Sequence, residues 1–289
     1  MLSLMVVISG PLRPAAAVEA PAKPAEQLLG AAARALGGSE ALGRLRSLSV
    51  AAECTGPDGP FRTWIQSLRP DQVHFRQIAA DHTTEIWSTP LKTWAKTSAG
   101  AWREIGPQMR GFVRGHEFHL LLFELESRFH NHRGGEADSV HGQKCDRILM
   151  QDETDQPASV CLAVEDGLPL ELELNPPGAE GAVRVRFGDW DSIDGLRYFR
   201  SFTLTEGPER TFTYKYVSIS PNQVTEEPFR IPAQLENGHN SDSSPMEQDE
   251  KRAEQHQTAE DVQQAGCRGQ ALLCPRTALA STRRDRSLP

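Results

Sequence analysis

Residues 187–204, FGDWDSIDGLRYFRSFTL, place three aspartates between two apolar runs, and their interpretation decides the fold. Asp194 is followed by Gly195, and Asp-Gly is a strong hairpin signal because glycine tolerates positive φ and aspartate bonds its own backbone. We therefore expect Asp189 and Asp191 to end one strand and residues 192–195 to form the turn. A catalytic carboxylate pair needs an environment that separates the two pKa values, which an exposed turn does not provide. The stretch predicts a hairpin, no catalytic residue and no enzyme.

The residues on both sides of this hairpin alternate between apolar and polar side chains. LELEL at 170–174 and VRVRF at 183–187 alternate strictly, which is typical of strands with one buried and one wet face. Turn residues separate similar segments along most of the chain. The predicted strands begin near Leu48 and continue at 62–68, 72–79, 83–89, 92–97, 101–106, 143–151, 158–165, 168–174, 182–190, 196–206 and 210–220. This pattern predicts a mainly β (α+β) fold, with one curved antiparallel sheet forming a half-open β-barrel.

Two segments have the spacing of helices. Leu28, Leu29, Ala32, Ala33 and Leu36 recur at helical intervals, Gly37-Gly38 ends that helix, and Ser39 is expected to cap a short second one. Residues 112–130 interrupt the strands with an apolar cluster, which predicts one inserted helix that closes the concave face of the sheet. We expect the polar residues 131–142 to form the loop after it.

The two ends of the chain differ from its centre. Residues 1–20 combine a short apolar run with an Ala-x-Ala pattern, which predicts a signal peptide cleaved near Ala17–Ala20 and a periplasmic or otherwise exported protein. Residues 235–289 contain no aromatic side chain and are expected to be a disordered polar tail. One domain is therefore expected at 25–234. The net charge of −8 argues against nucleic-acid binding.

A stripe of aromatic residues is the candidate binding surface. Aromatic side chains on successive antiparallel strands usually share one face, so the stripe either packs as ordinary sheet core or lines an apolar cavity. Under the second interpretation the inserted helix supplies the plug of the cavity. The candidate lining residues are Trp64, Phe75, Trp87, Trp94, Trp102, Phe118, Leu122, Phe202, Phe212 and Tyr214.

The histidines and cysteines of the chain are candidates for metal ligands, and two of the cysteines are candidates for a disulfide. HEFH at 116–119 lacks the HExxH spacing and an evident third ligand, and the cysteines form no CxxC, so no metal and no cofactor is predicted. Cys145 and Cys161 flank a polar turn and would lie roughly opposite each other in a hairpin. They are candidates for a disulfide in an oxidising compartment, and two free, buried thiols are the alternative.

The chain resembles the LolA/LolB-like superfamily of outer-membrane lipoprotein-sorting proteins. The resemblance rests on LLGAAARALGGSEALGRLRSL, GLPLELEL, FGDWDSIDGLRYFRSFTL and ISPNQVTEEPFRIP, and covers roughly residues 25–233. It implies an incomplete barrel whose helices cover an apolar cavity, and a non-enzymatic periplasmic carrier of lipid or lipoprotein acyl chains that meets membrane-associated partner proteins. The strand arginine that switches such carriers has no assigned counterpart here.

A second interpretation follows from the same resemblance. Some proteins with this opening are fused to an aspartic protease, but the residues after Pro232 lack the Asp-Thr/Ser-Gly motif of such a domain. The alternative is therefore a structural or peptide-interaction module related to the N-terminal domain of those proteins, without the protease.

Overall fold

A computed structural model describes residues 23–98, 100, 102–105, 116–153, 155–175, 181–207, 210–225 and 229. The predicted signal peptide and the predicted tail lie outside these residues. None of the helices in the described part of the chain is long and apolar enough to cross a membrane.

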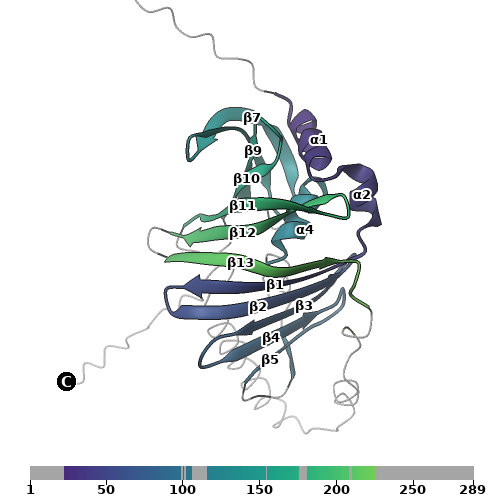
Figure 1. Cartoon of the computed structure of the whole chain (residues 1–289), viewed down its shortest axis with the longest axis vertical. Coiled ribbons are helices and arrows are strands. Elements are labelled where there is room, and N and C mark those ends of the chain that lie inside the picture. The colour runs from purple at the N-terminus through teal and green to yellow at the C-terminus, as the bar shows by residue number, and fades with distance from the viewer. Residues whose placement is uncertain are drawn as a thin grey trace, which may run out of the picture.

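The described residues build one curved antiparallel sheet of thirteen strands (Figure 1). The strands are β1 (Ser47–Gly56), β2 (Gly59–Leu68), β3 (Gln72–Ile78), β4 (Thr83–Ser88), β5 (Thr93–Thr97), β6 (Arg103–Ile105), β7 (His130–Val140), β8 (Gln143–Gln151), β9 (Pro157–Ala163), β10 (Pro169–Leu174), β11 (Val183–Ile193), β12 (Leu196–Glu206) and β13 (Arg210–Pro221). Their spatial order is β6-β5-β4-β3-β2-β1-β13-β12-β11-β10-β9-β8-β7, so the first and the last strand, β1 and β13, pair with each other within the sheet. The outermost strands, β6 and β7, do not pair with each other. The predicted half-open sheet is confirmed.

In the described part of the chain, four helices accompany this sheet: α1 (Ala25–Ala35), α2 (Gly38–Arg44), α4 (Phe118–Phe123) and α5 (Leu125–Arg128). We call the sheet face that contacts α4 the inner face and the opposite one the outer face. The single helix predicted over 112–130 is wrong in its extent, because the described part of it forms two short helices that are separated at Glu124. The first residues of that prediction, 112–115, lie outside the described part.

The predicted loop over residues 131–142 is wrong, because most of it is β7. The strand has no apolar alternation because it lies at the edge of the sheet and exposes most of its side chains. Its pairing with β8 shifts register twice, between His130 and Arg133 and again between Arg133 and Glu136. Lys23, just before α1, forms an isolated bridge to Gly135. Backbone hydrogen bonds rather than a side-chain pattern make this segment a strand.

The hairpin predicted over residues 187–204 is present between β11 and β12. Asp194 and Gly195 form its turn with φ values of 51° and 81°, the left-handed conformation that favours these residue types. The expected end of the first strand at Asp191 is too early, since β11 continues to Ile193. Asp191 instead accepts hydrogen bonds from Arg200 on the neighbouring strand. None of this requires a catalytic role for the aspartates.

The start of α2 also differs from the expectation. Ser39 was expected as the cap, but the helix begins at Gly38 and its cap is Gly37, whose φ is 131°. A side chain at Gly37 would meet the backbone oxygen of Gly195 and Leu196 in the β11–β12 hairpin. The close approach of the hairpin to the helix junction therefore selects glycine there.

Candidate ligand-binding site under helix α4

The inner face is apolar where the first four strands cross it. Val50, Ile65, Phe75 and Ile86 are direct partners across β1, β2, β3 and β4. Each is at most 6% exposed, and all four belong to the main hydrophobic core. Alternation with period two puts every second residue of these strands on this face. The result is a continuous apolar surface inside the curve of the sheet.

Helix α4 lies on this inner face, and its sequence, FHLLLF, is apolar almost all round. Phe118, His119, Leu120, Leu121 and Leu122 are all buried. The ring of Phe118 lies 4.8 Å from that of Phe202, and the His119 ring stacks on Phe199 at 3.9 Å. A short helix that buries five of six side chains acts as a plug in the concave surface.

His119 is part of the core rather than a metal ligand. Burial lowers its pKa to about 3, so its imidazole is neutral near pH 7. Its Nε2 lies 3.0 Å from the backbone oxygen of Phe199. His116, the other histidine of HEFH, is 2% exposed and its ring lies 5.3 Å from that of Phe75. The two histidines thus contribute aromatic contacts to the plug.

Buried ion pairs tie the plug to the sheet. Glu117, directly before α4, accepts a hydrogen bond from the Ser67 hydroxyl on β2 and pairs with Arg128 of α5 at 3.2 Å. Arg128 also pairs with Glu124 at 2.7 Å, and Glu124 pairs with Arg69 at 2.9 Å. Although burial disfavours its charged form, Glu117 and Glu124 raise the pKa of Arg128. We call these four charged residues the latch.

Arg69 anchors the latch to the α2–β1 connection. Its guanidinium donates hydrogen bonds of 3.1 Å to the backbone oxygens of Leu42 and Leu45. The side chain is one-third exposed, whereas that of Arg128 is only 9% exposed. The latch therefore has a buried half, formed by Glu117 and Arg128, and a half that water reaches through Arg69.

A small pocket remains between α4 and the sheet. Its cavity volume is about 10 Å³, which leaves room for about one water molecule. Its lining comprises Leu48, Val50, Ile65, Ser67, His116, Glu117, Phe118, His119, Leu120 and Tyr216. Pockets for small-molecule ligands usually measure roughly 300–1,000 Å³, so this one is too small for a long acyl chain while α4 stays in place. The plug itself occupies the volume that such a chain would need.

The structure divides the predicted lining residues between the two faces. Six belong to the main core with α4, and the rings of Phe202 and Tyr214 stack at 4.1 Å. Those six are Phe75, Phe118, Leu122, Phe202, Phe212 and Tyr214.

The four tryptophans lie apart from this group, on the outer face. Trp87 pairs with Trp94 and with His74, so both tryptophans alternate with the inner residues Ile86 and Ala95. Trp87, Trp94 and Trp102 pack with Phe229, and Trp64 is 37% exposed. The tryptophans were expected to share a face with Phe75, and the register shows that they do not.

Several inner-face residues were missed from the sequence. Phe199 and Tyr216 contact the plug through His119 but were not singled out. For Phe199 the reason is that Tyr198 is directly adjacent, so the sequence does not tell which of the two rings faces inward. A polar row was also missed: Thr63, Gln77 and Thr84 pair across β2, β3 and β4 on the inner face. All three are at most 5% exposed, and the Gln77 Nε2 and Thr84 Oγ1 atoms make no hydrogen bond in the structure. Period-two counting from Phe75 could have placed Gln77 inside.

Comparison with known proteins supports this fold. A LolA superfamily protein from Nitrosomonas europaea is similar over 73% of this chain and 99% of its own, with a TM-score of 0.54 and 12% identity. A DUF1329 family protein from Desulfovibrio piger is similar over the same shares, with a TM-score of 0.51 and 13% identity. No family model matches the sequence, and no curated protein does. The predicted resemblance to the LolA-like superfamily is confirmed at the level of the fold.

Proposed function

We propose that this chain is an exported, non-catalytic binding protein for lipid or lipoprotein acyl chains. The observation that carries the proposal is the plug: a six-residue apolar helix fills the concave apolar face of an open sheet. An acyl chain offers the same kind of surface to Phe202, Tyr216 and Val50 as α4 does. Binding would exchange one apolar partner for another, which keeps the cost of opening low.

The latch is the part of the site that sets this exchange. Moving α4 off the sheet breaks the Ser67–Glu117 contact and separates α5 from Arg69. A ligand that binds only the open form has an apparent affinity reduced by the fraction of molecules that are open. Weakening the latch at its exposed end should therefore strengthen binding.

The polar row gives the ligand an orientation. Thr63, Gln77 and Thr84 are buried beside the apolar surface of β1 to β4. Two of them, Gln77 and Thr84, have polar atoms without a hydrogen bond. Buried polar groups are normally satisfied, so a ligand with an ester, amide or carboxyl group would complete them. An amphiphile fits this surface when its polar end lies at the polar row and its chain lies across the neighbouring apolar residues Val50 and Ile65.

The first test is lipid mass spectrometry on the full chain, exported during expression and purified without detergent. We expect a co-purifying acyl lipid or, failing that, saturable binding of a fluorescent fatty acid. Arg69→Ala should tighten probe binding about five-fold, because removing a partly exposed ion pair costs the closed form about 1 kcal/mol. Arg62→Ala is the matched control, since it removes an arginine on β2 from an exposed pair with Glu53 on the neighbouring strand β1.

One result would count against the carrier, and another would count against the latch alone. An empty protein that refuses the probe both as wild type and as Arg69→Ala would contradict it and favour the peptide-interaction module. Equal effects of Arg69→Ala and Arg62→Ala on the probe would contradict the role of the latch while leaving acyl binding intact.

A further inference from the structure

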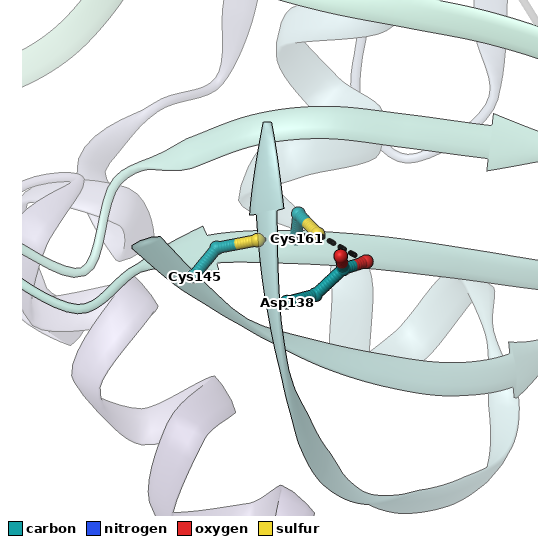
Figure 2. Close-up of side chains that lie close together, drawn as sticks. All are labelled: Asp138, Cys145 and Cys161. Atoms are coloured by element: carbon teal, nitrogen blue, oxygen red, sulfur yellow. Dashed lines mark hydrogen bonds between the residues drawn. The ribbon is translucent and has the colours of Figure 1, made fainter. Parts of the chain in front are cut away.

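Two buried cysteines face each other on the outer face of β8 and β9. Cys145 is 1% and Cys161 0% exposed, and their Sγ atoms lie 2.6 Å apart (Figure 2). The register pairs Cys145 with Ala163 and Cys161 with Arg147, so the cysteines are diagonal neighbours on adjacent strands. A disulfide bond measures about 2.05 Å, so the sulfurs need to approach by only roughly 0.5 Å. The two strands already hold them in place.

The surroundings favour a disulfide over a metal ion. Asp138 on β7 completes a group whose ligand atoms lie within 4.8 Å of one another. However, its Oδ2 accepts a hydrogen bond of 2.6 Å from Arg147, and a guanidinium at this position repels a cation. Two thiolates about 2.3 Å from one zinc ion in tetrahedral geometry also stand on the order of 3.7 Å apart, farther than these sulfurs. The arrangement suits a bond between the sulfurs better than a shared metal.

We propose that Cys145 and Cys161 form a structural disulfide that is made while the chain folds and is protected from reductants afterwards. The step requires an external disulfide, either a small-molecule disulfide or a disulfide-bearing thiol oxidase, as expected for the exported protein proposed above. One cysteine loses its proton and its thiolate attacks the external disulfide, which gives a mixed disulfide and releases one thiolate. The second cysteine loses its proton and attacks the protein sulfur of the mixed disulfide, which releases the other thiolate. Two protein thiols are oxidised, and one external disulfide is reduced to two thiols.

The timing follows from burial. Val140 and Leu170, from the strands on either side, pack against the two cysteines and form a separate small cluster. Burial raises the pKa of both thiols, so the folded protein offers neither a thiolate nor access to an oxidant. Exchange therefore has to occur before β7 and β10 cover the β8–β9 hairpin. The same cover then keeps reductants from the finished bond.

The bond would stabilise the hairpin by restricting the unfolded chain. The cysteines are 16 positions apart, close to the loop length for which disulfides give a substantial entropic gain. For a domain of this size we expect the melting temperature to fall by about 5–10 °C when the bond is absent. Cys54 provides an internal control, because it is a buried free thiol on the inner face, away from this pair.

The test is alkylation of the full exported chain after denaturation without a reductant, followed by peptide mass spectrometry. We expect the Cys54 peptide to be alkylated, and the Cys145 and Cys161 peptides to appear linked. Alkylation of Cys145 and Cys161 in the same way as Cys54 would overturn the proposal, as would a metal ion that stays with the protein and is released by thiol alkylation. Incubation of the folded protein with dithiothreitol should leave the link intact for hours, and rapid loss would contradict its protection.

A variant series separates the bond from simple packing. Cys145→Ala, Cys161→Ala and the double variant should lower the melting temperature equally if one bond is lost in each. Additive losses would mean two independent thiols and would overturn the proposal. In Cys54→Ala, peptide mass spectrometry should still show Cys145 linked to Cys161. Any loss of stability in that variant would therefore not come from the Cys145–Cys161 pair. Lipid binding is measured separately, so its failure leaves this result unchanged.

Discussion

The molecule has two aromatic clusters, one on each face of the same sheet, and they are covered differently. On the inner face, Phe199 and Phe202 lie under α4, whose position is fixed by buried ion pairs. On the outer face, Trp87 and Trp94 lie under Phe229, close to the C-terminal end of the described chain. Residue size gives no guide to the face that a ring joins, since Trp87 and Trp94 are on the outer face whereas Trp190 packs against the inner core. The register of each strand decides which face a side chain joins.

The largest expected effect on the free energy of unfolding comes from removing an aromatic ring on the inner face. Phe199 is fully buried and contacts His119, Phe187 and Trp190. Phe199→Ala should lower the free energy of unfolding by about 3–5 kcal/mol, because it leaves a cavity that closely packed neighbours cannot fill. Urea unfolding followed by circular dichroism measures this change. A loss below 1 kcal/mol would show that the inner cluster is loosely packed.

Removing an aromatic ring on the outer face should lower the free energy of unfolding by less. Trp94 is 4% exposed but belongs to a cluster of three buried residues with partly exposed neighbours. Trp94→Ala should cost about 3 kcal/mol, the lower end of the range for buried aromatic residues, because the cover can collapse into the gap. The same unfolding measurement applies, and fatty-acid probe binding should stay unchanged. Reduced probe binding at constant stability would place the ligand on the outer face instead.

Acid should affect the two faces in different pH ranges. His119 has a folded-state pKa of about 3, below the unfolded value of 6.5. Between these two pH values the unfolded chain binds a proton at His119 and the folded chain does not. Stability therefore falls as the pH drops below 6.5, by roughly 2 kcal/mol between pH 7 and 5. His119→Gln should remove this slope. An unchanged slope in the variant would assign the acid sensitivity to other groups.

The outer face responds at lower pH. A hydrogen bond from His74 lowers the pKa of Glu85 to about 2, despite the opposing effect of burial. The stability from this group is present above the unfolded pKa of about 4.5 and is lost as the pH falls toward 2. Glu85→Gln should reduce the dependence of the free energy of unfolding on pH, and only below pH 4.5. A change between pH 5 and 7 would contradict this separation of the two faces.

The smallest effect is expected at Trp64. This side chain is 37% exposed on the outer face, beside Arg76 in the register. Trp64→Ala should change the free energy of unfolding by less than about 1 kcal/mol and leave probe binding unchanged. Intrinsic fluorescence and urea unfolding test both statements. A large loss would mean that Trp64 has a partner outside the described residues.

The strands were predictable where one face is buried, and this explains what was missed. VRVRF alternates because β11 buries one face, whereas β10 also buries Glu171 on its other face. Both strands lie close to where the sequence predicts them, but β11 runs on to Ile193. β7 was missed because an edge strand with exposed side chains carries no such alternation. The latch was also beyond prediction, since Arg69 and Glu124 are far apart in the sequence and meet only through the fold. The direction of each aromatic ring required the register between strands.

The irregular pairing of β7 has a consequence for the behaviour of many copies of this protein together. An open sheet ends in unpaired backbone groups, and a regular edge is a template for fibre growth. The two register shifts in β7 and the bridge from Lys23 interrupt that template, and β6, at the other end, is only three residues long. Within the described residues, neither edge offers a neighbouring molecule a long regular strand to pair with. The sheet can therefore stay open without promoting polymerisation.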